Sequence, residues 1–408
     1  MSDVVRTALQ RGVALLDLGR AGEAEPHLRT ALAEEPGDPR VLALLADAVL
    51  RQQRYDEAVA TSRSALAADP GYVPAYSVLA AALAGLERFA DALDAVRHGL
   101  ALAPEAAVLH LQQAGVLLGL NRDGDALASI DRSLHLDPEN AEAHAVRAAV
   151  LVRLRRLDEA DAAVDDALRV DPENAEAHRV RGVIALHRGG GKRAVAAHRA
   201  ALRLDPTDSY SRDGLSTALK TRNPLYGALL RFGLWLDTLP KGVRIAVLIA
   251  PFVLTRVLRP FEDQTWAMVL IVVVAALALL TWTLEPLMNC VLLLTRDRRL
   301  LSRDAKRATC AFLFFLAAAV ACVVTGQVSG PAQLTAVAFG FGVWAMVTGS
   351  AHLLDPGPRK LVAVGGAGAV VVGAMAVVAV LAGAPGATVA VALLLIAGIA
   401  GLWFTAFS

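Results

Sequence analysis

The stretch DPENAEAH occurs twice in this 408-residue chain, at Asp137–His144 and again at Asp171–His178. The two copies lie 34 residues apart, and prolines continue the same spacing on both sides. These prolines are Pro36, Pro70, Pro104, Pro138, Pro172 and Pro206. A fixed period of this length is typical of a solenoid, in which each repeat buries its apolar surface against the next.

Each repeat is predicted to contain two antiparallel helices. Apolar residues recur with helical spacing on either side of a short polar turn, such as GLNRD at residues 119–123. A small residue recurs in the second helix, at Ala24, Ala58, Ala92, Ala126, Ala160 and Ala194. Four repeats begin with a candidate N-cap two residues after the proline, at Asp38, Asn140, Asn174 and Asp208. We therefore expect about six repeats over residues 5–208, closed by a capping helix at 209–220.

These features resemble the tetratricopeptide repeat family in their period, in the small residue of the second helix and in the closing proline. The resemblance implies an all-α solenoid whose first helices line a concave groove for an extended or helical peptide. By the family's convention, the groove would carry Arg6, Arg40, Asp47, Arg51, Leu111, Glu142, Arg153, Glu176, Arg179 and His187. The arginines would pair with carboxylates of a partner. The alternative, that these charges only solvate the surface, stays open at this point.

The composition changes after Asn223-Pro224. Residues 1–224 carry a net charge of −5, whereas residues 225–408 carry +6 among long apolar runs. The sequence predicts a solenoid domain at 1–222, an amphipathic interfacial segment at 223–241, and an α-helical transmembrane bundle at 242–408. Packing of residues 225–239 on the solenoid as a cap is an equal alternative to the interfacial position. About six spans are expected, at 242–258, 266–294, 308–325, 332–354, 361–382 and 388–407.

The basic loops predict the orientation of these spans. Residues Arg296–Arg307 (RDRRLLSRDAKR) have a net charge of +4 and residues 355–360 have +1, while the intervening loops are uncharged or acidic. The positive-inside rule then places both basic loops, the repeats and both termini in the cytoplasm. The chain is thus predicted to be a multi-pass protein of the plasma membrane. This topology requires residues 242–258 to cross the membrane. The basic loop 296–307 is also a candidate for binding anionic lipid.

Glu285 is a candidate intramembrane site, because a carboxylate inside an apolar run is costly unless it has a role. It lies near the inner end of its run, beside Pro286, where Arg296 or Arg298 would reach it. The sequence leaves both an anchoring ion pair and a proton or ion site open. His352 and Asp355 lie at another expected inner boundary.

Small residues recur at helical spacing in the last runs, as in Gly365, Ala369 and Gly373. Such stripes let helices approach closely, so they predict either a packed bundle or a homo-oligomer.

Several classes of function find no support in the sequence. The charges are nearly balanced, and no basic stretch is interleaved with aromatic residues, so we expect no nucleic-acid partner. The three cysteines, Cys290, Cys310 and Cys322, lack metal-ligand spacing. His144 and His178 lie one repeat apart, too far to share a zinc ion, and are predicted to be a duplicated packing position. No catalytic motif or phosphate loop is present, so we expect no enzyme, metal or cofactor.

The leading interpretation is a membrane-anchored scaffold that binds a protein or peptide partner in its cytosolic groove. The alternative is a transporter or channel regulated by the repeats, although intramembrane polar residues are few. A membrane enzyme acting on lipid-linked sugars is a third interpretation, for which only Glu262-Asp263 offers an acidic pair. The arrangement of repeats, an NPLYGALLRFGLWLDTLP segment (residues 223–240) and several spans is also similar to that of multi-pass membrane proteins of actinobacteria. That resemblance implies no activity.

Overall fold

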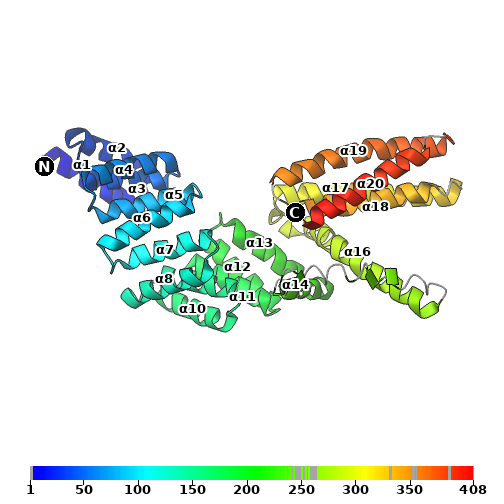
Figure 1. Ribbon diagram of the computed structural model, residues 1–408, viewed down its shortest axis with the longest axis horizontal. Coiled ribbons are helices and arrows are strands. Elements are labelled where there is room, and N and C mark those ends of the chain that lie inside the picture. The colour runs from blue at the N-terminus through cyan, green and yellow to red at the C-terminus, as the bar shows by residue number, and fades with distance from the viewer. Residues whose placement is uncertain are drawn as a thin grey trace. The chain divides into compact units, whose positions relative to one another are not determined.

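The computed structural model describes residues 3–221, 223–236, 238–240, 242–243, 250, 253–254, 256–257, 264–329, 333–351, 354, 356–384 and 387–407. All regular structure over these residues is helical (Figure 1). The chain divides into two compact units. Unit 1 consists of Met1–Ala185 and Ala196–Ser211, and unit 2 of Leu186–Val195 and Arg212–Ser408. The division therefore falls inside the sixth repeat, whereas the sequence analysis placed the domain boundary at residue 222.

The repeat region consists of successive helix pairs, as expected from the period of 34 residues. The pairs are α1 (Asp3–Asp17) and α2 (Ala21–Glu34), α3 (Pro39–Arg51) and α4 (Tyr55–Ala68), α5 (Val73–Gly85) and α6 (Phe89–Leu102), α7 (Ala107–Gly119) and α8 (Asp123–Leu136), α9 (Ala141–Arg153) and α10 (Leu157–Val170), and α11 (Ala175–His187) and α12 (Gly191–Leu204). The predicted capping helix is α13 (Ser209–Lys220).

The local chemistry of the repeats explains where these helices begin and how closely they pack. All four predicted N-caps are confirmed, because a side-chain oxygen of each accepts a first-turn amide hydrogen bond at 2.8–2.9 Å. Pro39 occupies the first turn of α3, where a missing amide costs nothing. The recurring alanines of the second helices are all completely buried. A larger side chain there would force the paired helices apart.

The turn inside each repeat contains one residue with a left-handed backbone. These residues are Gly19, Gln53, Glu87, Asn121, Arg155 and Gly189, with φ between 57° and 72°. The amide of the next residue reaches back to the end of the first helix, as Arg88 N does to Leu83 O at 2.9 Å. This arrangement satisfies helix-end carbonyls and favours glycine. Only two of the six turns have a glycine at this position, Gly19 and Gly189.

Unit 2 contains the apolar helices. They are α14 (Pro224–Leu236), α16 (Thr265–Leu294), α17 (Arg303–Ser329), α18 (Gln333–Ser350), α19 (Pro356–Leu381) and α20 (Ala387–Phe407). The five longest coincide with predicted spans, while the predicted span 242–258 falls mostly outside the described residues. By length and composition, Arg303–Gln327 and Gly357–Leu381 are apolar enough to cross a membrane. Helix α18 contacts α16, α17, α19 and α20, and so forms the centre of the bundle.

Two boundaries in unit 2 differ from the predictions. The expected loop at 296–307 is instead a short 3₁₀ helix, η2 (Arg296–Arg299), followed by the beginning of α17 at Arg303. Ser302 Oγ caps α17 by accepting a hydrogen bond from Ala305 N at 3.0 Å. Helix α19 also begins before its apolar run, at Pro356. Hydropathy marks where side chains turn apolar, whereas caps and first-turn prolines decide where a helix begins.

Small residues allow close packing inside the bundle. A Cβ atom on Gly365 would lie 2.9 Å from the Trp344 ring, and one on Gly401 would lie 3.2 Å from Val347. The close helix approach that the small-residue stripes predicted is therefore confirmed within one chain. A homo-oligomer through the same residues remains a prediction.

Candidate partner-binding face

The first helices of the repeats share one face of unit 1. Each of α1, α3, α5 and α7 contacts the first helix of the following repeat. One position, spaced by 34 residues, is at least partly exposed in all six first helices. Its residues are Val13, Asp47, Ala81, Gly115, Ala149 and Val183. We call the surface that runs along this series the odd-helix face.

The middle of the odd-helix face is small and apolar. Ala81, Gly115 and Ala149 follow one another along it, and no atom lies within 4 Å of where a Gly115 Cβ would be. Val108 is 58% exposed and Leu111 is half-buried on the same helix, α7. Apart from Leu111, the residues of this section were not among the predicted groove residues, which are mainly charged, although the 34-residue series in the sequence contains them.

The predicted site residues of the first two repeats lie at one end of this face. Arg6 and Arg40 are exposed. Asp47 pairs with Arg51 at 3.0 Å, one turn along the same helix. The guanidinium of Arg51 also donates to the carbonyl of Leu16 in the preceding repeat, at 3.1 Å. Arg51 therefore connects two repeats by a hydrogen bond, while its side chain is also exposed to solvent.

The last repeats carry the other predicted charges. Glu142 is exposed on α9. Glu176 forms an ion pair with Arg179, whose guanidinium lies 5.7 Å from the centre of the Tyr210 ring. Arg179 is thus held on two sides within unit 1, and only Glu142 of this group projects freely at the surface in the described structure.

Arg153 lies at a joint between repeats. Its side chain donates to Asp123 at 2.9 Å and to Asn121 at 3.0 Å, both in the preceding repeat. One repeat earlier, the positions equivalent to Arg153 and Asp123 are Gly119 and Phe89, and the Phe89 ring packs against Gly119. The joint position is therefore occupied by complementary pairs, and Arg153, although exposed, is paired with residues of its own chain. His187 is half-buried at the equivalent position of α11.

The repeated histidines make structural contacts. A ring nitrogen of His110, His144 and His178 lies 2.9–3.0 Å from the carbonyl oxygen of the proline six residues earlier. The hydroxyl of Tyr76 makes the equivalent bond to Pro70 at 3.1 Å. The predicted duplicated packing position is therefore confirmed. Among the described residues, no group of three His, Cys, Asp or Glu side chains is arranged to hold a metal ion.

His198 is the most perturbed titratable group of unit 1. It is completely buried, and its ring packs where Gly182 leaves room. Burial, reinforced by the positive charge of Arg179, lowers the pKa of His198 to about 4. The imidazole is therefore neutral at physiological pH and acts as a packing residue.

Glu285 belongs to a buried polar cluster within unit 2. It forms an ion pair with Lys220 of α13 and accepts a hydrogen bond from the Tyr226 hydroxyl of α14 at 2.7 Å. The Lys220 ammonium also lies 5.8 Å from the Tyr226 ring centre. Burial and the charge of Glu285 both raise the pKa of the Tyr226 hydroxyl. The sequence analysis looked only to nearby arginines and missed Lys220, which lies 65 residues away in the chain.

Asn289 lies one helical turn beyond Glu285 and is 1% exposed. Within the described part of the chain, neither its amide oxygen nor its amide nitrogen has a hydrogen-bond partner. No pattern in the sequence distinguished this residue from its apolar neighbours. The other polar candidates of the second half, His352, Asp355 and the pair Glu262-Asp263, lie outside the described residues.

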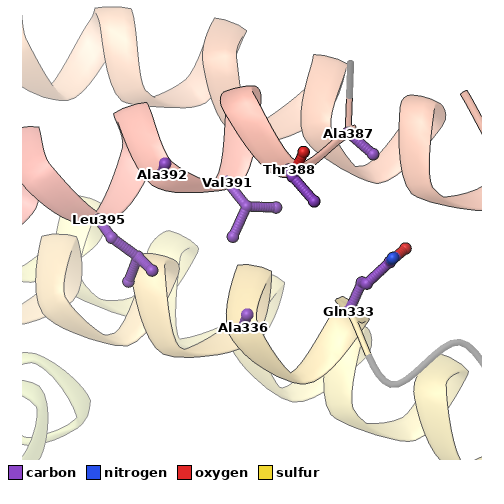
Figure 2. A pocket seen from close by; sticks show the side chains of 7 residues that line it. All are labelled: Gln333, Ala336, Ala387, Thr388, Val391, Ala392 and Leu395. Carbon is purple, nitrogen blue, oxygen red and sulfur yellow. The ribbon is translucent and has the colours of Figure 1, made fainter. Parts of the chain in front are cut away.

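A small cavity lies between α18 and α20 (Figure 2). It has a volume of about 240 Å³ and is lined by Gln333, Ala336, Ala387, Thr388, Val391, Ala392 and Leu395. Its lining contains no titratable group, so it offers room for an apolar group but no acid–base chemistry.

With this geometry established, comparison with known proteins identifies the repeats. One tetratricopeptide repeat model matches residues 9–73 and 146–209, and a second matches residues 49–115. The repeats are of the tetratricopeptide type. No curated protein sequence matches the chain significantly.

Several solved structures are similar to parts of the chain. A thermophilic tetratricopeptide repeat protein of Thermus thermophilus is 29% identical, with 44% of this chain and 97% of that one covered and a TM-score of 0.41. Pseudomonas aeruginosa PilF is 20% identical over 52% and 96% of the two chains, with a TM-score of 0.44. The type IV pilus biogenesis factor PilW is 19% identical over 54% and 100%, with a TM-score of 0.47.

Proposed function

We propose that this protein is a non-enzymatic, membrane-anchored scaffold whose tetratricopeptide repeats bind a protein or peptide partner. The observation that carries the proposal is the odd-helix face, on which Gly115 is exposed and Ala81 and Ala149 are partly exposed. An exposed strip of small and apolar residues admits the side chains of a docked segment and gains free energy when it is covered.

The charges at its ends specify the partner further. Arg40 is exposed at the end formed by the first repeats, and Glu142 is exposed toward the other end. A partner segment with an apolar middle, an acidic group near α3 and a basic group near α9 matches this pattern. Such charges set orientation and partner choice more than they add affinity.

We further propose that unit 2 anchors the protein in the plasma membrane with about six spans, so that the repeats and both termini lie in the cytoplasm. Two long apolar helices, Arg303–Gln327 and Gly357–Leu381, support the anchor. The excess of basic residues at 296–307 and 355–360 supports the orientation. Extraction of membranes at alkaline pH tests the anchor, since a spanning protein stays in the pellet and a peripheral one is released.

The partner face is tested with matched arginine substitutions in the full-length protein. Gly115→Arg and Ala81→Arg place charge on the odd-helix face. Gly124→Arg and Ala60→Arg place the same charge on exposed positions of second helices, and Gly124 also has open space around it.

Cross-linking in cells followed by mass spectrometry would compare what each protein captures. A partner recovered with the wild type and the second-helix variants, but reduced at least tenfold with the odd-helix variants, would support the proposal. Equal recovery with all four variants would show that this face does not bind the partner.

A further inference from the structure

The junction between α16 and α17 concentrates positive charge in unit 2. Six of its twelve residues, 296–307, are basic and two are acidic. Within the described structure, the side chains of Arg298 and Arg299 are exposed and make no ion pair. Arg359, by contrast, is bound to the Asp304 carboxylate and to the carbonyl of Leu354. Arg298 and Arg299 of η2 are therefore available to an anion from outside the chain.

The last turns of α16 present an apolar strip that leads to these arginines. Leu287, Val291 and Leu294 are spaced so that they lie on one face of the helix, and they are 39%, 51% and 90% exposed. This strip ends where η2 begins. The exposed apolar surface and the exposed positive charge are consequently adjacent.

A recess lies at the point where they meet. It has a volume of about 480 Å³ and is lined by Leu293, Leu294, Thr295, Arg298 and Arg299. Thr295 fixes the turn, because its hydroxyl donates to the carbonyl of Leu292 at 2.9 Å and lies 3.4 Å from the Asp297 amide nitrogen. The lining of the recess thus combines two leucines with two exposed arginines.

We propose that this recess binds the headgroup of an anionic phospholipid. The phosphate would accept hydrogen bonds from Arg298 and Arg299, and an acyl chain would lie along Leu287, Val291 and Leu294. A soluble anion uses only the arginines and leaves the leucine strip uncovered. The strip therefore favours a lipid over free phosphate. The inference rests on the proposed membrane anchor.

The experiment compares the full-length protein with two double variants. Arg298→Gln/Arg299→Gln removes the headgroup contacts. The control, Arg63→Gln/Arg132→Gln, removes two exposed arginines of equal charge from second helices of unit 1. Each protein is extracted into detergent with equal amounts of phosphatidylglycerol and phosphatidylcholine, and the retained lipids are counted by native mass spectrometry. A parallel sample contains inorganic phosphate as a competitor.

The wild type and the control are expected to retain phosphatidylglycerol preferentially. The Arg298→Gln/Arg299→Gln protein is expected to lose roughly 25-fold of this preference, about fivefold for each arginine. Equal lipid ratios for all three proteins would overturn the inference. Abolition of the preference by inorganic phosphate would show an anion site without a lipid. Release of all three proteins from membranes at alkaline pH would instead refute the anchor, which separates the two failures.

Discussion

Replacing Glu87 by glycine should stabilise the repeats, although it removes every side-chain atom at that position. Glu87 has a φ of 58° in the turn between α5 and α6, and its side chain is exposed without a hydrogen bond or ion pair in the described structure. Gln53 occupies the same position in the preceding repeat, with a φ of 61°. Both residues hold a backbone conformation in which Cβ crowds the carbonyl oxygen.

The magnitude follows from two opposing effects. A left-handed conformation costs an L-residue about 1–2 kcal/mol, which glycine avoids. Glycine loses more backbone entropy on folding, which offsets about 0.5–1 kcal/mol of that gain. We expect Glu87→Gly and Gln53→Gly each to stabilise the repeats by about 0.5–1 kcal/mol. The two turns are one repeat apart, so the double variant should gain close to the sum.

Hydrogen exchange of the full-length protein, resolved by peptide, measures this locally. In the Glu87→Gly protein, exchange in α5 and α6 should slow by about two- to fivefold. Gly19→Ala should accelerate exchange in α1 and α2, because Gly19 has a φ of 72° and open space where the methyl would lie. Arg63→Gly, at an exposed position inside α4, should destabilise by about 1 kcal/mol. If Glu87→Gly accelerates exchange as Arg63→Gly does, backbone strain does not limit the stability of these turns.

Three further predictions concern packing and charge, each read out by hydrogen exchange in the helices involved. Gly119→Ala should destabilise the joint between its repeats by about 1–3 kcal/mol, because the added methyl would lie 2.5 Å from Cδ1 of the Phe89 ring. Adding Phe89→Leu should restore part of this loss of stability. If Gly119→Ala has no effect, the joint is loosely packed. Lys220→Met should destabilise α13 and α16 by about 1–3 kcal/mol, since it removes the buried ammonium that pairs with the half-buried Glu285 carboxylate, whereas Lys220→Met/Glu285→Gln should cost less; equal losses would contradict the ion pair. The pKa of His198 is about 4 when folded and near 6.5 when unfolded, so its contribution is present above pH 6.5 and is lost as the pH falls toward 4. From pH 7 to pH 5 the loss should be about 2 kcal/mol, and a His198→Leu protein should lack this part of the pH dependence.

Much of the fold was predictable because the repeat imposes local rules again and again. The N-caps at Asp38, Asn140, Asn174 and Asp208 and the buried alanines were located from the sequence, and the structure confirms them. A helix also lies where the capping helix was expected, at Ser209–Lys220. Each depends on residues close together in the chain. The helix starts at Arg303 and Pro356 were missed, because hydropathy does not report where a cap begins a helix.

The candidate site was less predictable, since the side chains available to a partner depend on which other repeats bind them. Arg153 was expected to face a partner, yet it bonds to Asp123 and Asn121 of the preceding repeat. Glu285 was singled out from the sequence, but its partners Lys220 and Tyr226 come from helices distant in sequence. Gly115 and the small residues around it were not predicted as site residues, because they carry no charge.

The sequence by itself determined the period, the helical pairs and the apolar character of the second half, because each of these is written in local spacing and composition. The tertiary structure decided which charged side chains pair within the chain, which remain available to a partner, and which small residues accommodate an aromatic ring. Several of those outcomes depend on contacts between residues about 30 or more positions apart, such as Arg153 with Asp123 and Phe89 with Gly119. A folded chain selects such contacts by packing and by satisfying buried polar groups, and neither is visible in a single repeat.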